Sequence, residues 1–415
     1  MDAQVKDQAA FPFAIGRKEF IAIIALLMAL NALAIDIMLP GMQEIGESLG
    51  VADPNDRQLV ISAYLIGFGI MQLAFGPISD RFGRRGPLFA GLTVYVLAAL
   101  VAVFVPSFTQ LLILRLIQGA GAAATRVIAV AVVRDVFGGR QMAEVMSLVF
   151  TVFMIMPVIA PNAGQIILLY ADWHAIFIFM AVIAAAITLW AYIRLPETLA
   201  AENRRPFTLT SVAQGFALVM TNRLSLWYTL ATSVIFGALF GFINSAQQVY
   251  VGIYGLGVWF PVMFAAVAGL MSVASFANSK LVMRLGMRRL SHGALIGFTA
   301  VSALMTGLAA MGPVPFPLFL AMFATVMVFF GAIGSNFNAI GMEPLGHLAG
   351  TASSVQGFFQ TVGGALVGAG IGQMFDGTVL PLSLGFFSVG ALALVCVLIA
   401  EKGTLFSVGA SAPKH

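Results

Sequence analysis

The sequence has few charged residues, one cysteine and four histidines, and each shortage excludes a class of protein. Only 9% of its 415 residues are charged, 60% are hydrophobic and the mean hydropathy is +0.99, whereas soluble domains are about 25% charged. Cys396 is alone, so no internal disulfide can form. The scattered histidines and the absence of a Walker-type loop or an HExxH sequence predict no enzyme activity, cofactor or metal site. Most charges lie between apolar runs, so we expect no nucleic-acid partner.

Long apolar runs are what the sequence has instead, and they predict an all-α integral membrane protein. A helix that crosses the bilayer needs about 20 predominantly apolar residues. Twelve runs fit: Phe20–Met42, Gln58–Ile78, Pro87–Val105, Thr109–Val133, Met142–Leu168, Trp173–Leu195, Leu224–Tyr250, Val258–Leu281, Ser291–Met311, Pro317–Ile340, Thr351–Phe375 and Leu380–Ala400. They lack the alternation of β-barrel strands. Pro106 and Ser107 supply the only break between the third and fourth runs.

The positions of Lys and Arg predict the orientation, because these residues gather in cytoplasmic loops. With the N-terminus inside, the inner loops hold Arg17, Lys18, Arg81, Arg84, Arg85, Arg134, Arg140, Arg194, Arg204, Arg205, Arg223, Lys280, Arg284, Arg288 and Arg289. The outer loops hold a single basic residue, Arg57, together with several acids. We therefore expect a multi-pass protein of the inner (plasma) membrane with both termini in the cytoplasm.

The connection between the sixth and seventh runs is long and polar, and it divides the chain into two halves. We expect a six-helix half over residues 1–195, a cytoplasmic linker over residues 196–223 and a second six-helix half over residues 224–415. Within the linker, Leu209–Met220 is modestly apolar and lies either along the membrane surface or buried as a loop helix. A weak repeat supports the division: Arg81-Phe82-Gly83 after the second run corresponds to Arg284-Leu285-Gly286 after the eighth.

Several motifs resemble those of a known transporter family. The segment Gly76–Arg85 is similar to the signature between helices 2 and 3 of the major facilitator superfamily, and Arg115–Gly119 to the arginine motif of its proton-coupled exporters. Met156–Gln165 resembles the proline-glycine motif of drug/proton antiporters, while Ala34–Pro40 and Leu195–Leu199 resemble the Bcr/CflA branch. The resemblance implies two six-helix halves around a central cavity, a drug-like substrate, protons as a second substrate and function as a monomer.

Three charged residues lie well inside the predicted spans, where a charge costs about 2.5–3.5 kcal/mol on insertion scales. Asp36 and Arg115 are each six residues from the predicted outer end of their run, which places both about 9 Å below the outer rim. Asp36 is the only acid deep in a span, so we interpret it as the proton carrier and Arg115 as the residue that tunes it. A static ion pair between the two helices is the alternative.

The third charge, Arg126, lies three turns below Arg115 on nearly the same helical face. It either faces the cavity or reaches toward the cytoplasmic surface. Gln118, one turn below Arg115, is the natural hydrogen-bond partner of that guanidinium. In the second half, candidate pocket residues are Asn244, Gln247, Asn336, Gln356 and Gln360, each of which could equally form a hydrogen bond between helices.

Two motifs are candidates for gating. By resemblance, Asp80, Arg81, Arg84 and Arg85 latch the two halves together on the cytoplasmic side; otherwise they bind anionic lipid or merely set the topology. In the fifth run, Pro157 and Pro161 predict a bent helix, and with Gly164 they are interpreted as a seal against proton leak.

The function that fits these residues is proton-coupled export of small amphipathic drugs by alternating access. One embedded acid against two arginines favours neutral, zwitterionic or weakly anionic substrates over permanent cations. A proton-coupled importer or a facilitator of a small metabolite is the alternative, and a non-transporting receptor is a third possibility. Asp36 and the antiporter-like fifth run favour the exporter.

Overall fold

The protein is a bundle of helices, described here from a computed structural model over residues 15–204 and 209–406. Within these ranges no residue is in a β-strand. The helices are α1 (Arg17–Asp36), α2 (Met42–Ser48), α3 (Leu59–Phe82), α4 (Arg85–Ala102), α5 (Phe108–Val136), α6 (Gly139–Leu168), α7 (His174–Arg194), α8 (Leu209–Thr221), α9 (Arg223–Gln247), α10 (Phe260–Leu285), α11 (Met287–Met311), α12 (Phe316–Met342), α13 (Ala349–Phe358), α14 (Gly364–Gln373) and α15 (Leu380–Ala400). The predicted all-α class is confirmed for this part of the chain.

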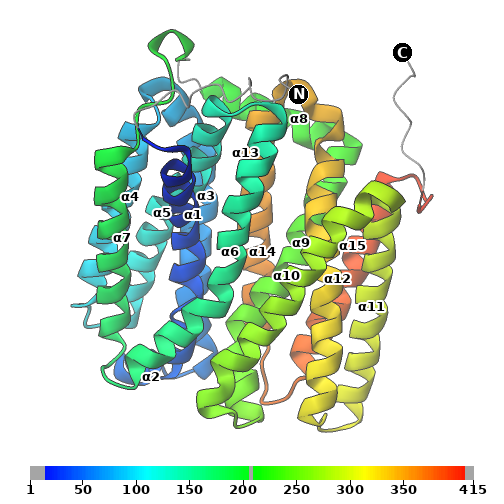
Figure 1. Cartoon of the computed structure of the whole chain (residues 1–415). Coiled ribbons are helices and arrows are strands. Elements are labelled where there is room, and N and C mark those ends of the chain that lie inside the picture. The colour runs from blue at the N-terminus through cyan, green and yellow to red at the C-terminus, as the bar shows by residue number, and fades with distance from the viewer. Residues whose placement is uncertain (1–14, 205–208, 407–415) are drawn as a thin grey trace, which may run out of the picture.

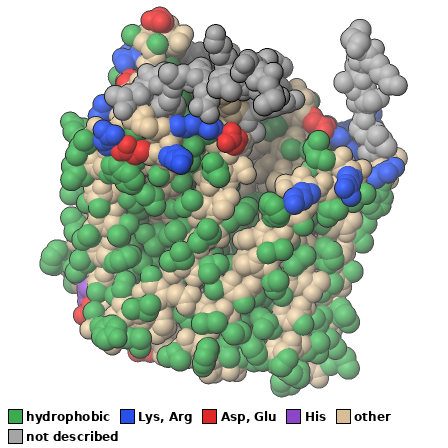
Figure 2. Space-filling model, viewed as in Figure 1, with side chains coloured by type: hydrophobic (Ala, Val, Ile, Leu, Met, Phe, Trp, Pro, Cys, Tyr) green, Lys and Arg blue, Asp and Glu red, His purple; other side chains and the backbone are tan. Residues whose placement is uncertain are grey.

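The long helices stand side by side, with α1 and α3 to α7 on one side of Figure 1 and α9 to α12 with α15 on the other. Helix α8 crosses one end of the bundle, and α2 lies at the opposite end, which the charge distribution predicts to be the outer one. Figure 2 shows most of the visible charged side chains at the α8 end and a broad hydrophobic belt below them. Apolar side chains on the outer surface are what a protein surrounded by lipid requires.

Eleven helical stretches of the described residues are long and apolar enough to cross a bilayer, and each overlaps one predicted run. The run predicted over Thr351–Phe375 is divided by a π-helical segment, Phe359–Gly363, into α13 and α14, neither of which is long enough alone. The count of twelve spans therefore stays a prediction. The two termini, residues 1–14 and 407–415, lie outside the described residues, so their cytoplasmic location stays a prediction. Part of the linker, residues 205–208, also lies outside them.

The first helix is shorter than predicted, because α1 ends at Asp36 and not near Met42. Proline has no backbone N–H, so Pro40 cannot donate to the carbonyl of Asp36 four residues earlier, and its ring crowds that carbonyl. The chain continues through a 3₁₀ turn at Leu39–Gly41 into α2. Asp36 therefore lies at a helix terminus and not inside a continuous helix, which corrects the expected geometry around the candidate proton carrier.

Other helix ends follow from local sequence. Ser107 begins α5 by accepting a hydrogen bond from the backbone N–H of Gln110 (3.4 Å), as the Pro106-Ser107 break predicts. Helices α3 and α10 both end at glycines in the left-handed region, Gly83 (φ +89°, ψ 169°) and Gly286 (φ +82°, ψ 154°). The weak sequence repeat thus corresponds to the same backbone turn in both halves, a turn that favours glycine.

The linker helix α8 packs against the bundle. Val219 is fully buried with Val355 of α13, and the Phe216 ring lies edge-on to Phe358 and Phe359, with ring centroids 5.9 and 5.8 Å apart. These contacts favour the buried loop helix over the membrane-surface alternative. They also join the linker to the second half of the chain.

Helices α3 and α5 are in backbone contact through two glycines. A Cβ added at Gly67 would overlap the carbonyl oxygen of Leu116, and one added at Gly119 would overlap the carbonyl oxygen of Tyr64. Because each glycine faces the other helix, no side chain can enter between them. Small residues allow such close approach in membranes, where packing and not water expulsion holds helices together.

This contact predicts a strong effect of a small substitution. Gly119→Val should lower the free energy of unfolding by about 3 kcal/mol, because the added carbons meet backbone that cannot move aside. The measurement is the midpoint of thermal unfolding of the purified protein in detergent. Gly307→Val in α11 is the matched control, since nothing lies within 4 Å of a Cβ there. Equal midpoints for the two variants would contradict the contact.

Candidate functional site

Arg115 is the buried charge around which three helices of the first half meet. Its side chain is fully buried. The guanidinium donates to the carbonyl of Val60 on α3 (3.2 Å), to the carbonyl of Ala34 on α1 (2.9 Å) and to Oε1 of Gln118 (2.7 Å). The predicted Arg115–Gln118 hydrogen bond is confirmed. The charge is thus solvated by carbonyl oxygens in place of water, as a membrane-embedded arginine requires.

A polar cluster that the sequence alone did not indicate lies beside Arg115. The hydroxyl of Tyr64 donates to Oδ1 of Asn31 (2.9 Å), whose Nδ2 donates to Oγ1 of Thr125 (2.9 Å). The Arg115 guanidinium also lies over the Tyr64 ring, with Cζ 4.5 Å from the centroid. Asn31, a lone amide in an apolar run, was the available sequence signal. The cluster ties α1, α3 and α5 together with groups that need no net charge.

Asp36 does not form an ion pair with Arg115, although the sequence predicts that the two residues lie at the same depth in the membrane. The carboxyl group is buried, and among the described residues it has no ion pair and accepts no hydrogen bond. Arg115 contacts the carbonyl of Ala34, two residues earlier, which leaves the carboxyl of Asp36 free. The static ion-pair interpretation is therefore wrong for this structure. The two residues remain neighbours through the end of α1.

The proline-containing helix α6 contacts the chain directly beside Asp36. A Cβ added at Gly164 would overlap the carbonyl oxygen of Ile37. Pro157 and Pro161 lie inside the same helix, which bends visibly in Figure 1, as predicted. A shift of α6 toward α1 would therefore displace the backbone next to Asp36.

Arg126 has no ion pair and no hydrogen bond to any residue of the described ranges, and its side chain is partly exposed. At 100° per residue it lies within about 20° of Arg115 on α5. The exposed apolar residues Ile113 and Ile117 of α5 lie on the other side of the helix from Arg126. The partial exposure of Arg126 is therefore on an inward face, which favours the cavity-facing alternative.

The candidate pocket residues of the second half are mostly bonded to neighbouring helices. Asn336 donates to Oδ1 of Asn278 (2.8 Å), and Gln360 accepts from Asn338 (3.3 Å). Asn244 donates to Oγ of Ser62 (3.2 Å), and Gln356 is buried with its amide nitrogen near Gly341. These contacts match the alternative of hydrogen bonds between helices for Asn336 and Gln360.

Amide side chains join the two halves at the predicted outer end, opposite α8. Asn55 donates to the carbonyls of Gln373 (3.2 Å) and Phe375 (2.9 Å). Gln58 donates to Gln248 (2.5 Å), and Gln248 donates to Oδ1 of Asn55 (2.7 Å). The pairs Gln247–Gln43 (3.3 Å), Asn244–Ser62 and, deeper, Gln72–Thr361 (3.0 Å) continue the contact. This outer end is closed by bonds between uncharged groups.

The charged gating motif at the other end of α3 bonds within its own half. The guanidinium of Arg84, 2% exposed, donates to Asp135 at the end of α5 (2.7 Å) and to Asp80 (2.6 Å). The backbone N–H groups of Arg84 and Arg85 donate to the carboxylate of Glu197 after α7 (2.8 and 3.1 Å). Arg81 is exposed over Phe82. In this structure the Arg84 and Arg85 contacts hold one half together, which differs from the expected bridge between halves.

The second half has a counterpart of this clamp. Arg288 after α10 donates to Glu343 at the end of α12 (2.8 Å) and to Glu401 after α15 (2.7 Å). Tyr228 also donates to Glu401 (2.9 Å) and bonds to Nε2 of His292 (2.8 Å). Each half therefore joins its helix ends through an arginine after α3 or α10 and through acids at the ends of α5 and α7 or of α12 and α15.

Comparison with known proteins agrees with the motifs and the geometry. The sequence profile of the Major Facilitator Superfamily matches residues 24–368. The chain belongs to the major facilitator superfamily. It is therefore a membrane transporter and not an enzyme. It is 33% identical to a bicyclomycin resistance protein homolog of Haemophilus influenzae over 91% of this chain and 94% of that protein. It is also 29% identical to multidrug resistance protein D of Escherichia coli, over 90% and 94% of the two chains.

The fold of the superfamily is seen directly in solved structures. The crystal structure of a D-xylose-proton symporter superposes with a TM-score of 0.71 at 13% identity, over 94% of this chain and 99% of that one. The structure of a human organic anion transporter, MFSD10, gives 0.62 at 17% identity over 92% and 99%. These likenesses establish the shared fold of this member of the superfamily.

The clamp around Arg84 predicts different costs for two arginines of one motif. Arg84→Gln should lower the free energy of unfolding by about 3 kcal/mol, because it removes the guanidinium that Asp135 and Asp80 both contact. Arg81→Gln, the matched control, should stay within about 0.5 kcal/mol, since that side chain is exposed. The measurement is the midpoint of thermal unfolding in detergent. An equal loss for both would show that Arg84 does not carry the clamp.

Proposed function

We propose that this transporter exports small amphipathic drugs in exchange for protons, with both termini in the cytoplasm. The names of its relatives, which include bicyclomycin, chloramphenicol and multidrug resistance proteins, support drugs as the substrate class. The observation that carries the proton part is Asp36, a buried carboxyl group without a partner among the described residues. An embedded acid of this kind is the usual site of proton binding in transporters.

The surroundings of Asp36 supply a way to couple its protonation to motion. Arg115 holds the carbonyl of Ala34 on one side, and Gly164 of α6 presses on the carbonyl of Ile37 on the other. A carboxyl group takes up a proton more readily as it loses water and releases it as water returns. Movement of α6 against α1 changes the access of water to Asp36, so it changes the protonation of that residue.

This role predicts a selective loss of coupling. Asp36→Asn should reduce drug accumulation in inverted vesicles driven by a pH gradient to the level of vesicles without the protein, because an amide cannot carry the proton. Binding of the drug to the purified variant should persist. Asp172→Asn, in the exposed loop between α6 and α7, is the matched control and should transport normally. Full gradient-driven transport by Asp36→Asn would assign the proton to another group.

The charge balance of the first half favours uncharged or weakly anionic substrates. Its described interior holds two arginines, Arg115 and Arg126, and one acid, Asp36. Arg115 donates hydrogen bonds to two backbone carbonyls and to Gln118. Arg126 forms no ion pair within the described ranges. A permanent cation loses its hydration when it leaves water and needs favourable interactions in the cavity to replace it. A positively charged cavity does not offer such interactions.

A resistance panel tests this charge argument. Cells that express the protein should survive raised concentrations of chloramphenicol, which is neutral, and gain little protection against tetraphenylphosphonium. Arg126→Gln should improve protection against the cation relative to the parent protein, because one positive charge is removed. Strong protection against tetraphenylphosphonium by the parent protein, with none against chloramphenicol, would refute the proposed preference.

A further inference from the structure

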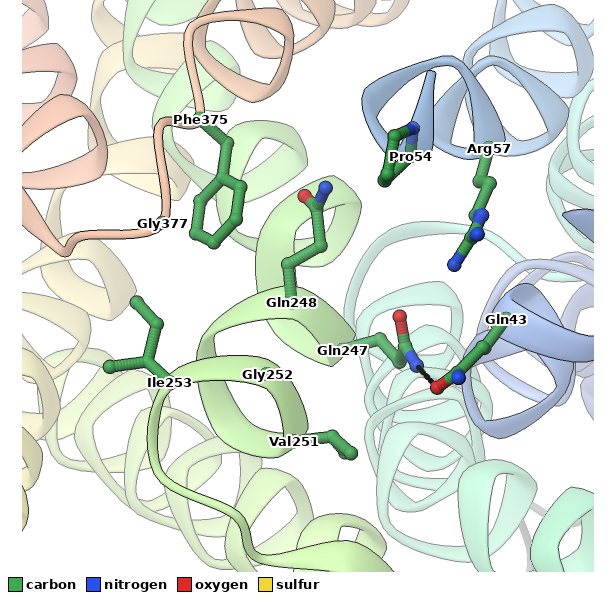
Figure 3. Close-up of a pocket in the computed structure, with 10 residues that line it drawn as sticks. All are labelled: Gln43, Pro54, Arg57, Gln247, Gln248, Val251, Gly252, Ile253, Phe375 and Gly377. Carbon is green, nitrogen blue, oxygen red and sulfur yellow. Dashed lines mark hydrogen bonds between the residues drawn. The ribbon is translucent and has the colours of Figure 1, made fainter. Parts of the chain in front are cut away.

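A cavity of about 370 Å³ lies between the two halves at the outer end. It is next to the amide hydrogen bonds that join the halves there. Gln43 and Arg57 line it from the first half, and Gln247, Val251 and Phe375 line it from the second (Figure 3). Its volume is within the range of small-molecule sites, about 300–1,000 Å³. It is separate from Asp36 and Arg115, neither of which lines it.

Arg57, the only basic residue predicted for the outer loops, supplies an uncommitted positive charge to this cavity. Its guanidinium points into the open space in Figure 3. Among the described residues it forms no ion pair and no hydrogen bond, and its Nε is buried without a partner. Its stem packs over Gly46, where even a Cβ would collide with it. A partly dehydrated arginine of this kind gains most from an anion that it can bind with two hydrogen bonds.

The acidic residues near Arg57 accept hydrogen bonds from other groups or form no ion pair with it. Asp53 accepts from the backbone N–H of Asn55 (2.8 Å), and Glu47 accepts from Gln43 (2.9 Å). Asp56, next to Arg57 in the chain, forms no ion pair with it within the described residues. Arg57 therefore has no ion pair within its own loop among the described residues and is available to an external ligand.

The second half contributes both apolar and amide side chains to the cavity lining. Phe375 lies on the far side of Gln248 from the guanidinium, and Val251 and Ile253 on the segment after α9 also line the cavity (Figure 3). Gln247 donates its Nε2 to Gln43, so its carbonyl oxygen remains an acceptor. A cavity lined by a cationic group and an aromatic ring matches a ligand with an oxyanion at one end and an apolar ring at the other.

We propose that this outer cavity binds small aromatic oxyanions, sulfonates or carboxylates, from the external side, with the oxyanion on Arg57 and the ring against Phe375. Because the two contacts belong to different halves, a bound anion joins the halves and favours the closed outer end over any state that separates them. Such a ligand slows the transport cycle from outside. The binding itself is independent of the proposed drug export, whereas the slowing depends on it.

Benzenesulfonate and benzenesulfonamide form a matched pair of probes. They share the ring and the sulfonyl group, and only the first is an anion that stays charged and carries no protons across the membrane. Saturation-transfer NMR with the purified full-length protein in detergent should show benzenesulfonate, and not benzenesulfonamide, in contact with the protein. Arg57→Gln should weaken the binding of benzenesulfonate at least about tenfold, since a charge-assisted pair is lost.

Arg289→Gln, at an exposed arginine of the opposite end, is the matched control and should bind as the parent does. Arg57→Lys keeps the charge without the planar fork, so it should bind with intermediate strength. Equal binding of the two probes, or unchanged binding of benzenesulfonate by Arg57→Gln, would overturn the assignment. The NMR measurement uses no drug and no gradient, so it stands even where drug export fails.

The effect on the cycle is measured in inverted vesicles, whose lumen faces the outer end. Benzenesulfonate trapped in the lumen should slow chloramphenicol uptake by the parent protein and by Arg289→Gln. The same concentration of benzenesulfonamide should not. Uptake unaffected by lumenal benzenesulfonate, in a protein that binds it by NMR, would overturn the part of the proposal that concerns closure.

Discussion

The structure of the first half depends on the solvation of one buried guanidinium. The Arg115 side chain is fully buried, so its donors need oxygen atoms of the protein. They find carbonyls on α1 and α3 and the amide of Gln118. Beside these bonds, Gly67 and Gly119 bring the backbones of α3 and α5 into contact. Among the described residues Asp36 forms no ion pair, so the proposed proton carrier is separate from the arginine that joins the helices.

The interactions within each half differ in charge from the interactions between the halves. Within each half, ion pairs fix the helix ends at the α8 side: Arg84 with Asp135, and Arg288 with Glu343 and Glu401. Between the halves, the bonds at the outer end join uncharged groups such as Asn55, Gln58 and Gln248. Amides that separate are rehydrated at little net cost, whereas parting a dehydrated ion pair is costly. Neutral contacts therefore suit an interface that opens during the proposed export cycle, and ion pairs suit halves that stay intact.

Features that depend on a few consecutive residues could be predicted from the sequence, and features that depend on packing could not. The apolar runs, the break at Ser107, the Arg115–Gln118 bond and the bend of α6 all follow from spacing or from one residue type. The end of α1 was predicted too late, because hydrophobicity continues past Asp36 while Pro40 has already removed a backbone bond. The absent Asp36–Arg115 pair, and the cluster of Tyr64, Asn31 and Thr125, depend on helix rotations that a sequence does not specify.

The contacts of Gly67 with α5 and of Gly119 with α3 also fix the distance between these two helices. Two backbones that touch cannot approach further, and the buried groups on both sides oppose their separation. Spin labels attached to the ends of α3 and α5 should therefore report one separation at every stage of turnover. Label pairs that join α3 to α14 can then be read against that fixed value, so a change in their spectrum measures rearrangement between the halves and not distortion within one.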